Sequence, residues 1–214
     1  NRNGGQEGPI QVSDDGKLAA VGHMYQNGMV RVVDLEGGSQ VSAVQPAQNA
    51  AVFGALSPKG ETLATWGQHY NQGKGTPEDH QRIARTIQLW DAKEGKEKAS
   101  LVSDIYQIAT VRFSPDGARV AAGGNGVVQL WDVATGKLER RFAGRAGQGT
   151  QLVFSPDGRV LTAAGQDGCV QSWEVATGKR AGICEGPVMA VAGLRYRPDG
   201  QLLAWAANAN ALEI

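Results

Sequence analysis

The sequence predicts an all-β fold of repeated four-stranded antiparallel sheets, from a recurring turn, a recurring Trp-Asp signal and a constant spacing between them. The turn occurs five times, as Ser13-Asp14-Asp15-Gly16, Ser57-Pro58-Lys59-Gly60, Ser114-Pro115-Asp116-Gly117, Ser155-Pro156-Asp157-Gly158 and Arg197-Pro198-Asp199-Gly200. The second signal occurs four times, as Val33-Asp34, Trp90-Asp91, Trp131-Asp132 and Trp173-Glu174. The next turn glycine always follows the acidic residue by 26 positions (34 to 60, 91 to 117, 132 to 158 and 174 to 200). This regularity indicates stacked repeat units.

Each repeat has the pattern of four short strands. In the third repeat, residues 111–113 are apolar at alternate positions, as in a strand, and lead into the Pro-Asp-Gly turn. Residues 118–122 are expected to form the next strand. Gly124-Asn125-Gly126 tolerates the positive φ of a hairpin turn before a third strand at 127–131. The last turn, Ala134-Thr135-Gly136-Lys137, recurs in the fourth repeat as Ala176-Thr177-Gly178-Lys179. A sheet this small cannot bury both of its faces alone, so the repeats must stack as blades around an axis.

These motifs resemble the WD-repeat family, in particular Phe-Ser-Pro-Asp-Gly at 113–117 and 154–158 and Gln-Leu-Trp-Asp at 88–91 and 129–132. Together with Ala-Thr-Gly-Lys they are most similar to bacterial members. The resemblance covers residues 10–214 and implies a β-propeller with blades at about 10–44, 51–102, 109–142, 150–184 and 191–214. Residues 1–9 are glycine-rich, and we expect them to be a disordered leader.

The sequence departs from the family in its Gly-His dipeptide, whose histidine lies ten residues before the turn serine and ties a strand hydroxyl to a loop aspartate. The equivalent positions hold Ala47, Asp104, Arg145 and Pro187, and Gly22-His23 falls instead at the end of a second strand. The loop acid remains only as Asp167, with Asn27 and Asn125 as substitutes. We therefore expect no complete buried hydrogen-bond tetrad and blades held mainly by packing.

Alignment of the fifth repeat on the fourth places residues 211–214 opposite residues 169–172, so the chain is expected to stop inside a third strand. The prediction is an incomplete ring of four full blades and a truncated fifth. The remaining two or three blades are expected beyond Ile214, in the same polypeptide.

Composition narrows the possible partners. Lys plus Arg equals Asp plus Glu at 21 each, so no net field favours nucleic acid, and no apolar stretch approaches the roughly 20 residues that span a membrane. The two cysteines, Cys169 and Cys184, are too few for a disulfide framework and are expected to be buried fillers on the third and fourth strands of one blade. No signal-peptide pattern is recognisable in the sequence, and the compartment stays unknown, with the cytoplasm as the favoured expectation.

No catalytic constellation is recognisable. The sequence lacks a Gly-x-Ser-x-Gly elbow, and Gln72-Gly73-Lys74-Gly75-Thr76 lacks the spacing of a phosphate loop. His69, Glu78, Asp79 and His80 could ligate a metal if their loop folded back, but a solvated polar loop is the favoured interpretation. We therefore predict no metal, no cofactor and no enzyme activity.

The predicted function is a protein-interaction scaffold whose partners are other proteins or peptides. The alternative is a sensor or targeting propeller of a larger kinase or redox enzyme, with the catalytic part outside these residues. The second repeat has 31 residues from Gly60 to Asp91 against 15 and 16 in the third and fourth, which places an insertion of about 15 residues within Gly67–Arg85. This insertion is either a partner site or a disordered surface insertion without a partner.

The predicted partner site combines the insertion with loops expected on the same face of the disc. Tyrosine and arginine are the expected anchors, because they offer large contact area and directional donors. The residues are His23, Tyr25, His69, Tyr70, Lys74, Glu78, Asp79, His80, Arg82, Arg85, Asp104, Tyr106, Arg145, Gln148 and Asp167.

Overall fold

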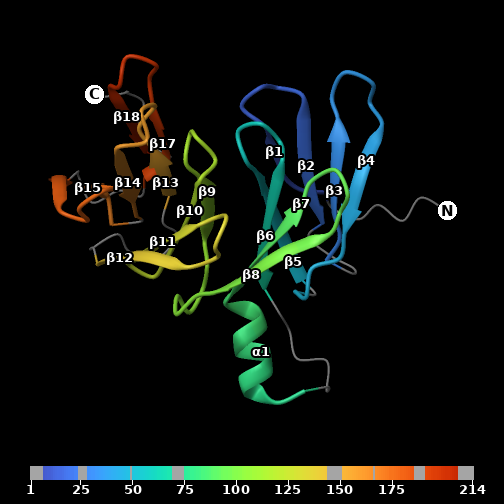
Figure 1. The fold of residues 1–214 in the computed structure, drawn as a ribbon. Helices are drawn as coiled ribbons and strands as arrows, with labels where there is room; N and C mark the ends of the chain where they lie inside the picture. The colour runs from blue at the N-terminus through green and yellow to red at the C-terminus, as the bar shows by residue number, and fades with distance from the viewer. Residues whose placement is uncertain are drawn as a thin grey trace. The chain divides into compact units, whose positions relative to one another are not determined.

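The computed structural model describes residues 7–23, 28–48, 50–68, 75–143, 151–165, 167–185 and 191–206. The chain forms two compact units, Asn1–Tyr106 and Gln107–Ile214, and each is described by itself (Figure 1). Every sheet is an antiparallel meander in which consecutive strands are neighbours. The all-β prediction of repeated four-stranded sheets is therefore confirmed.

The described part of the first unit has two four-stranded sheets and one helix. The first sheet consists of β1 (Glu7–Val12), β2 (Leu18–His23), β3 (Val30–Asp34) and β4 (Gln40–Val44). The second consists of β5 (Ala50–Leu56), β6 (Thr62–Gln68), β7 (Thr86–Asp91) and β8 (Glu97–Val102), with helix α1 (Pro77–Ala84) between β6 and β7. β1 begins three residues earlier than the first expected blade, and Gly22-His23 ends a second strand as expected.

Among its described residues, the second unit has two four-stranded sheets and one two-stranded sheet. The first sheet consists of β9 (Thr110–Phe113), β10 (Arg119–Gly124), β11 (Val127–Asp132) and β12 (Leu138–Ala143). The second consists of β13 (Gln151–Phe154), β14 (Val160–Ala164), β15 (Cys169–Glu174) and β16 (Arg180–Glu185). The third pairs β17 (Val191–Tyr196) with β18 (Leu202–Ala206). The third strand expected at the end of the fifth repeat lies outside the described residues.

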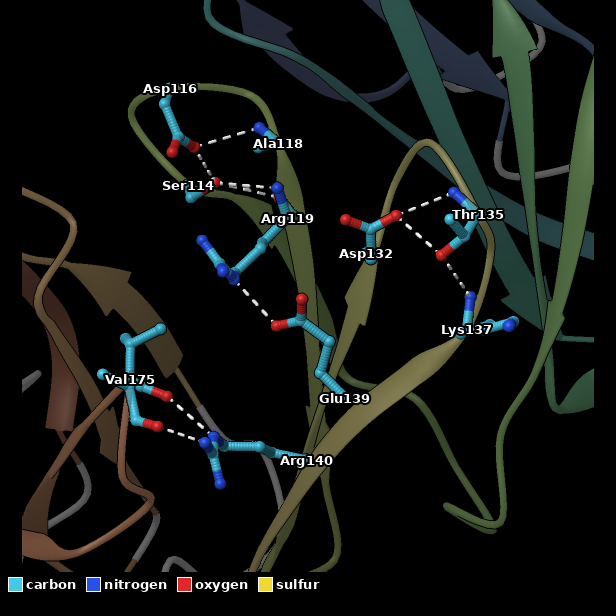
Figure 2. Close-up of polar contacts among 11 residues, drawn as sticks. Ser114, Asp116, Ala118, Arg119, Asp132, Thr135, Lys137, Glu139, Arg140 and Val175 are labelled. Atoms are coloured by element: carbon cyan, nitrogen blue, oxygen red, sulfur yellow. Dashed lines mark hydrogen bonds and ion pairs between the residues drawn. The ribbon is translucent and has the colours of Figure 1, made fainter.

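In three of the recurring turns, those at Ser13, Ser114 and Ser155, the serine hydroxyl donates to the aspartate two residues later. In the third repeat the Ser114 hydroxyl donates to Asp116 Oδ1 at 2.5 Å, and Asp116 in turn accepts from the Ala118 amide at 3.0 Å (Figure 2). The Ser114 hydroxyl is the main reason that the pKa of Asp116 is lowered. Gly117 takes a φ of 72°, which a residue with a Cβ rarely adopts. The sequence pattern therefore fixes the geometry of this turn.

Neighbouring sheets within each unit pack face to face. In the first unit, Val30 and Val32 pack with Leu63 and Trp90 of the next sheet, and the Trp90 indole donates to Thr65 Oγ1 at 2.8 Å. In the second unit, the rings of Phe142 and Trp173 have centroids 5.4 Å apart within a continuous core. The tryptophans of the repeat therefore lie in the core, as the sequence predicts.

A polar contact at one repeat position also joins adjacent sheets. The Ser42 hydroxyl on β4 donates to the Ala92 carbonyl at 2.5 Å. Arg140, at the equivalent position on β12, donates from Nε to the Val175 carbonyl at 2.9 Å (Figure 2). Its Nη2 donates to the Ala176 carbonyl. In both cases the last strand of one sheet supplies the donor and the strand 3–4 turn of the next supplies the acceptor.

Candidate partner-binding site around helix α1

The insertion predicted between the second and third strands of the second repeat contains a helix. Strand β6 ends at Gln68 and β7 begins at Thr86, so the insertion lies where the spacing placed it, and Gly67 and Gln68 still belong to β6. The expectation of a polar loop here was wrong for residues 77–84, which form helix α1. The insertion is therefore a structured element from residue 76 onward.

A capping box starts the helix. Thr76 accepts from the Asp79 amide through its hydroxyl at 3.2 Å, and the Asp79 carboxylate accepts from the Thr76 amide at 3.1 Å and from its hydroxyl at 3.0 Å. Pro77 occupies the first turn, where no backbone donor is needed. The hydrogen bonds from Thr76, first from its backbone and then from its side chain, lower the pKa of Asp79.

We expect this cap to weaken in acid. Because the folded-state pKa of Asp79 is lowered, its stabilising contribution is complete above the ordinary value of 3.8 and is lost as the pH falls through the lower folded value. The amide resonance of Thr76, followed by NMR against pH, should titrate with a midpoint below 3.8. In the control Asp79→Asn the same resonance should not titrate in this range. A midpoint at or above 3.8 would contradict the cap.

Side chains and amides from the sheet fix the other end of the helix. The fully buried Gln48, in the loop between β4 and β5, donates from Nε2 to the carbonyls of Ile83 at 2.9 Å and Thr86 at 2.7 Å. The Thr86 hydroxyl donates to the Arg82 carbonyl at 2.7 Å, and the Ser103 amide donates to the Arg85 carbonyl at 2.9 Å. The last carbonyls of a helix have no partners within it, so these donors hold α1 to the sheet.

A second glutamine supports the loop that carries Gln48. Gln88 on β7 accepts from the Ala47 amide through Oε1 at 2.6 Å and donates to Glu97 Oε2 at 2.9 Å. Ala47 occupies the position where the family's histidine was expected. A buried glutamine therefore ties a strand to the preceding loop here, in addition to the packing that we expect to be the main interaction between blades.

Replacing Gln48 with leucine is expected to release the helix. The change leaves the part-buried carbonyl of Ile83 and the buried carbonyl of Thr86 without the Gln48 donor, which costs about 1–3 kcal/mol. Trypsin should then cleave after Arg82 and Arg85 faster than in the unchanged protein. Gln81→Leu, on the exposed side of the same helix, is the matched control. Equal cleavage rates in the two variants would show that Gln48 does not anchor α1.

An exposed aromatic side chain lies beside the anchored end of the helix. The Arg85 guanidinium lies over the Tyr106 ring, 5.4 Å from its centroid, and 69% of Tyr106 is exposed. The Ile105 amide donates to the Ser103 hydroxyl at 2.9 Å, which shapes the loop that presents Tyr106. An arginine held on an aromatic ring offers a flat, partly ordered surface with free donor capacity.

The structure brings only part of the predicted site together. Arg85 and Tyr106 are in contact, while Glu78, Asp79, His80 and Arg82 lie along α1 and Asp104 lies in the Tyr106 loop. Asp167 belongs to the second unit, where it accepts from the Cys169 amide at 3.2 Å in a turn. Of His23 only the backbone is described. Tyr25, His69, Tyr70, Lys74, Arg145 and Gln148 lie outside the described residues. The site as a whole stays a prediction.

The remaining candidate groups are a metal site, the two cysteines and a membrane-spanning helix. No set of three or more His, Cys, Asp and Glu in the described part of the chain could hold a metal ion, and His69 lies outside that part. Cys169 on β15 is buried and has no disulfide, while Cys184 lies on β16, so both cysteines are on the predicted strands. None of the helices that the structure describes is long and apolar enough to cross a membrane.

Of the residues that sequence analysis missed, some belong to a recognisable sequence pattern and one does not. Thr76-Pro77-Glu78-Asp79 is a recognisable helix start, because a threonine followed by proline and, three residues on, an acid is typical of a capping box. Gln88 belongs to a repeated Gln-x-Trp pattern with Gln129 and Gln171, and all three glutamines are buried. Gln48 has no such signal, because only the fold brings it to the helix.

Stacked four-stranded antiparallel meanders define a blade-type repeat protein. Residues 96–132 and 137–174 match the family model described as WD domain, G-beta repeat. The first match spans β8 to β11 and the second spans β12 to β15, so each covers the last strand of one sheet and three strands of the next. These matches support a WD-repeat family. No curated protein matches the chain.

Proposed function

We propose that this chain is a bacterial-type WD-repeat propeller protein over residues 10–214, and that it binds other proteins or peptides without catalysing a reaction. The observation that carries the proposal is a docked helix on a repeat: the second sheet carries α1 between β6 and β7, and a buried glutamine donates to the carbonyls at the end of that helix. A binding element positioned by a rigid scaffold is a common way for repeat folds to acquire specificity.

The proposed contact surface is the exposed side of α1 with the Tyr106 loop. Figure 1 shows α1 projecting beyond the strands of its own sheet. Glu78 and Arg82 are exposed on the helix, and Tyr106 is exposed beside it. Because the helix is capped at one end and anchored at the other, a partner would meet an ordered surface and lose little entropy in ordering it.

The test is differential capture by the full-length protein from cells of its source. The double variant Arg82→Glu with Tyr106→Ser changes the proposed surface, and the double variant Leu35→Ser with Lys96→Glu changes exposed residues elsewhere in the same unit. Proteins held by the unchanged chain and by the control should be lost from the first variant. Recovery of the same proteins with both variants would reject α1 as the partner site.

A further inference from the structure

In the second unit, three adjacent strands carry the equivalent position of three successive repeats. β9, β13 and β17 are the first strands of their sheets, and β13 contacts both of the others. Counting back two residues from the turns at Ser114, Ser155 and Arg197 gives Arg112, Val153 and Arg195. Two arginines thus occupy the same register on strands that flank a third, with valine between them.

Arg112 is a half-buried cation without a carboxylate partner in the described part of the unit. Its Nη1 donates to the Val111 carbonyl at 3.1 Å. Burial first, and then the positive charge of Arg195, lower the pKa of Arg112, so both influences disfavour its charged form. The ion pairs described in this unit join Arg119 to Glu139, Arg159 to Asp157 and Arg197 to Asp199, and none includes Arg112 or Arg195.

An anion bound beside Arg112 would compensate both for the burial of its charge and for the repulsion by the positive charge of Arg195. A partly desolvated guanidinium remains charged, so it gains most from a charged acceptor, and a second guanidinium nearby adds to the attraction. We propose that Arg112 and Arg195 bind the carboxylates of an acidic peptide segment of a partner protein. Two arginines in a chain of zero net charge are too few for a nucleic-acid backbone, which favours a local acidic ligand. This site is independent of helix α1.

The test is calorimetric titration of the whole chain with hexaglutamate at low ionic strength, with hexaglutamine as the neutral probe. The unchanged chain should bind hexaglutamate and not hexaglutamine, and added salt should weaken the binding. Arg112→Gln and Arg195→Gln should each reduce the affinity about tenfold or more. Arg180→Gln, an exposed arginine of β16 in the same unit, is the matched control and should leave the affinity unchanged.

A second variant separates loss of the site from loss of the fold. Arg112→Met removes the half-buried charge but keeps the length of the side chain, so the melting temperature should hold or rise while hexaglutamate binding falls. The proposal is overturned if hexaglutamate binds no better than hexaglutamine or if Arg180→Gln weakens binding as much as Arg112→Gln. It is also overturned if inorganic phosphate alone binds in an arginine-dependent way and hexaglutamate does not.

Discussion

Replacing Trp173 with alanine is expected to destabilise the second unit by about 3–5 kcal/mol, the largest effect of any single change considered for this protein. Only 3% of Trp173 is exposed, and its ring lies against Phe142 of the preceding sheet, with centroids 5.4 Å apart. Truncation removes apolar surface from the core that joins the two sheets and leaves a cavity. The rest of that core, which includes Leu152 and Leu161, can relax only in part.

Urea denaturation measures the loss of unfolding free energy in Trp173→Ala. Amide hydrogen exchange then shows whether the lost stability lies in residues 107–214. Ile183→Ala is the matched control, because Ile183 lies on the neighbouring strand β16 and is 44% exposed. The control should cost much less, since little apolar surface returns to water. A loss for Trp173→Ala no greater than for Ile183→Ala would show that the two sheets are not packed as described.

Replacing Gly22 with alanine is expected to cost about 1–3 kcal/mol or more, although only one methyl group is added. A Cβ at Gly22 would lie 2.3 Å from the carbonyl oxygen of Val52, on the first strand of the next sheet. The obstacle is backbone rather than a flexible side chain, so β2 and β5 would have to separate. Relief by a rotamer change is therefore impossible.

The matched control for this second prediction is Gly182→Ala. Gly182 also lies within a strand, β16, but a Cβ there meets nothing within 4 Å. Alanine should be neutral or slightly stabilising at this position, because it restricts the unfolded chain more than glycine does. The free energies of unfolding of both variants, from urea titration, decide the matter. Similar values for the two changes would rule out the close approach of β2 and β5.

The sequence by itself determined the repeated architecture and the place of the insertion in the second repeat. Recurrent turns with glycine at positive φ, such as Gly117, are local features, and a local pattern suffices to predict them. The constant spacing located the insertion between β6 and β7 for the same reason. The helix start at Thr76 is also a local feature, and its capping-box sequence predicts it.

Only the tertiary structure decided which residues hold and surround the candidate sites. Gln48 donates hydrogen bonds to the carbonyls of Ile83 and Thr86, which lie more than thirty positions away in the sequence. No periodicity of the sequence predicts these hydrogen bonds. The contact of Arg85 with Tyr106 depends on where two separate loops end, and the shared register of Arg112 and Arg195 on strands that flank β13 depends on the stacking of three sheets. Such contacts follow from how the sheets pack, and packing is a property of the whole unit rather than of any segment.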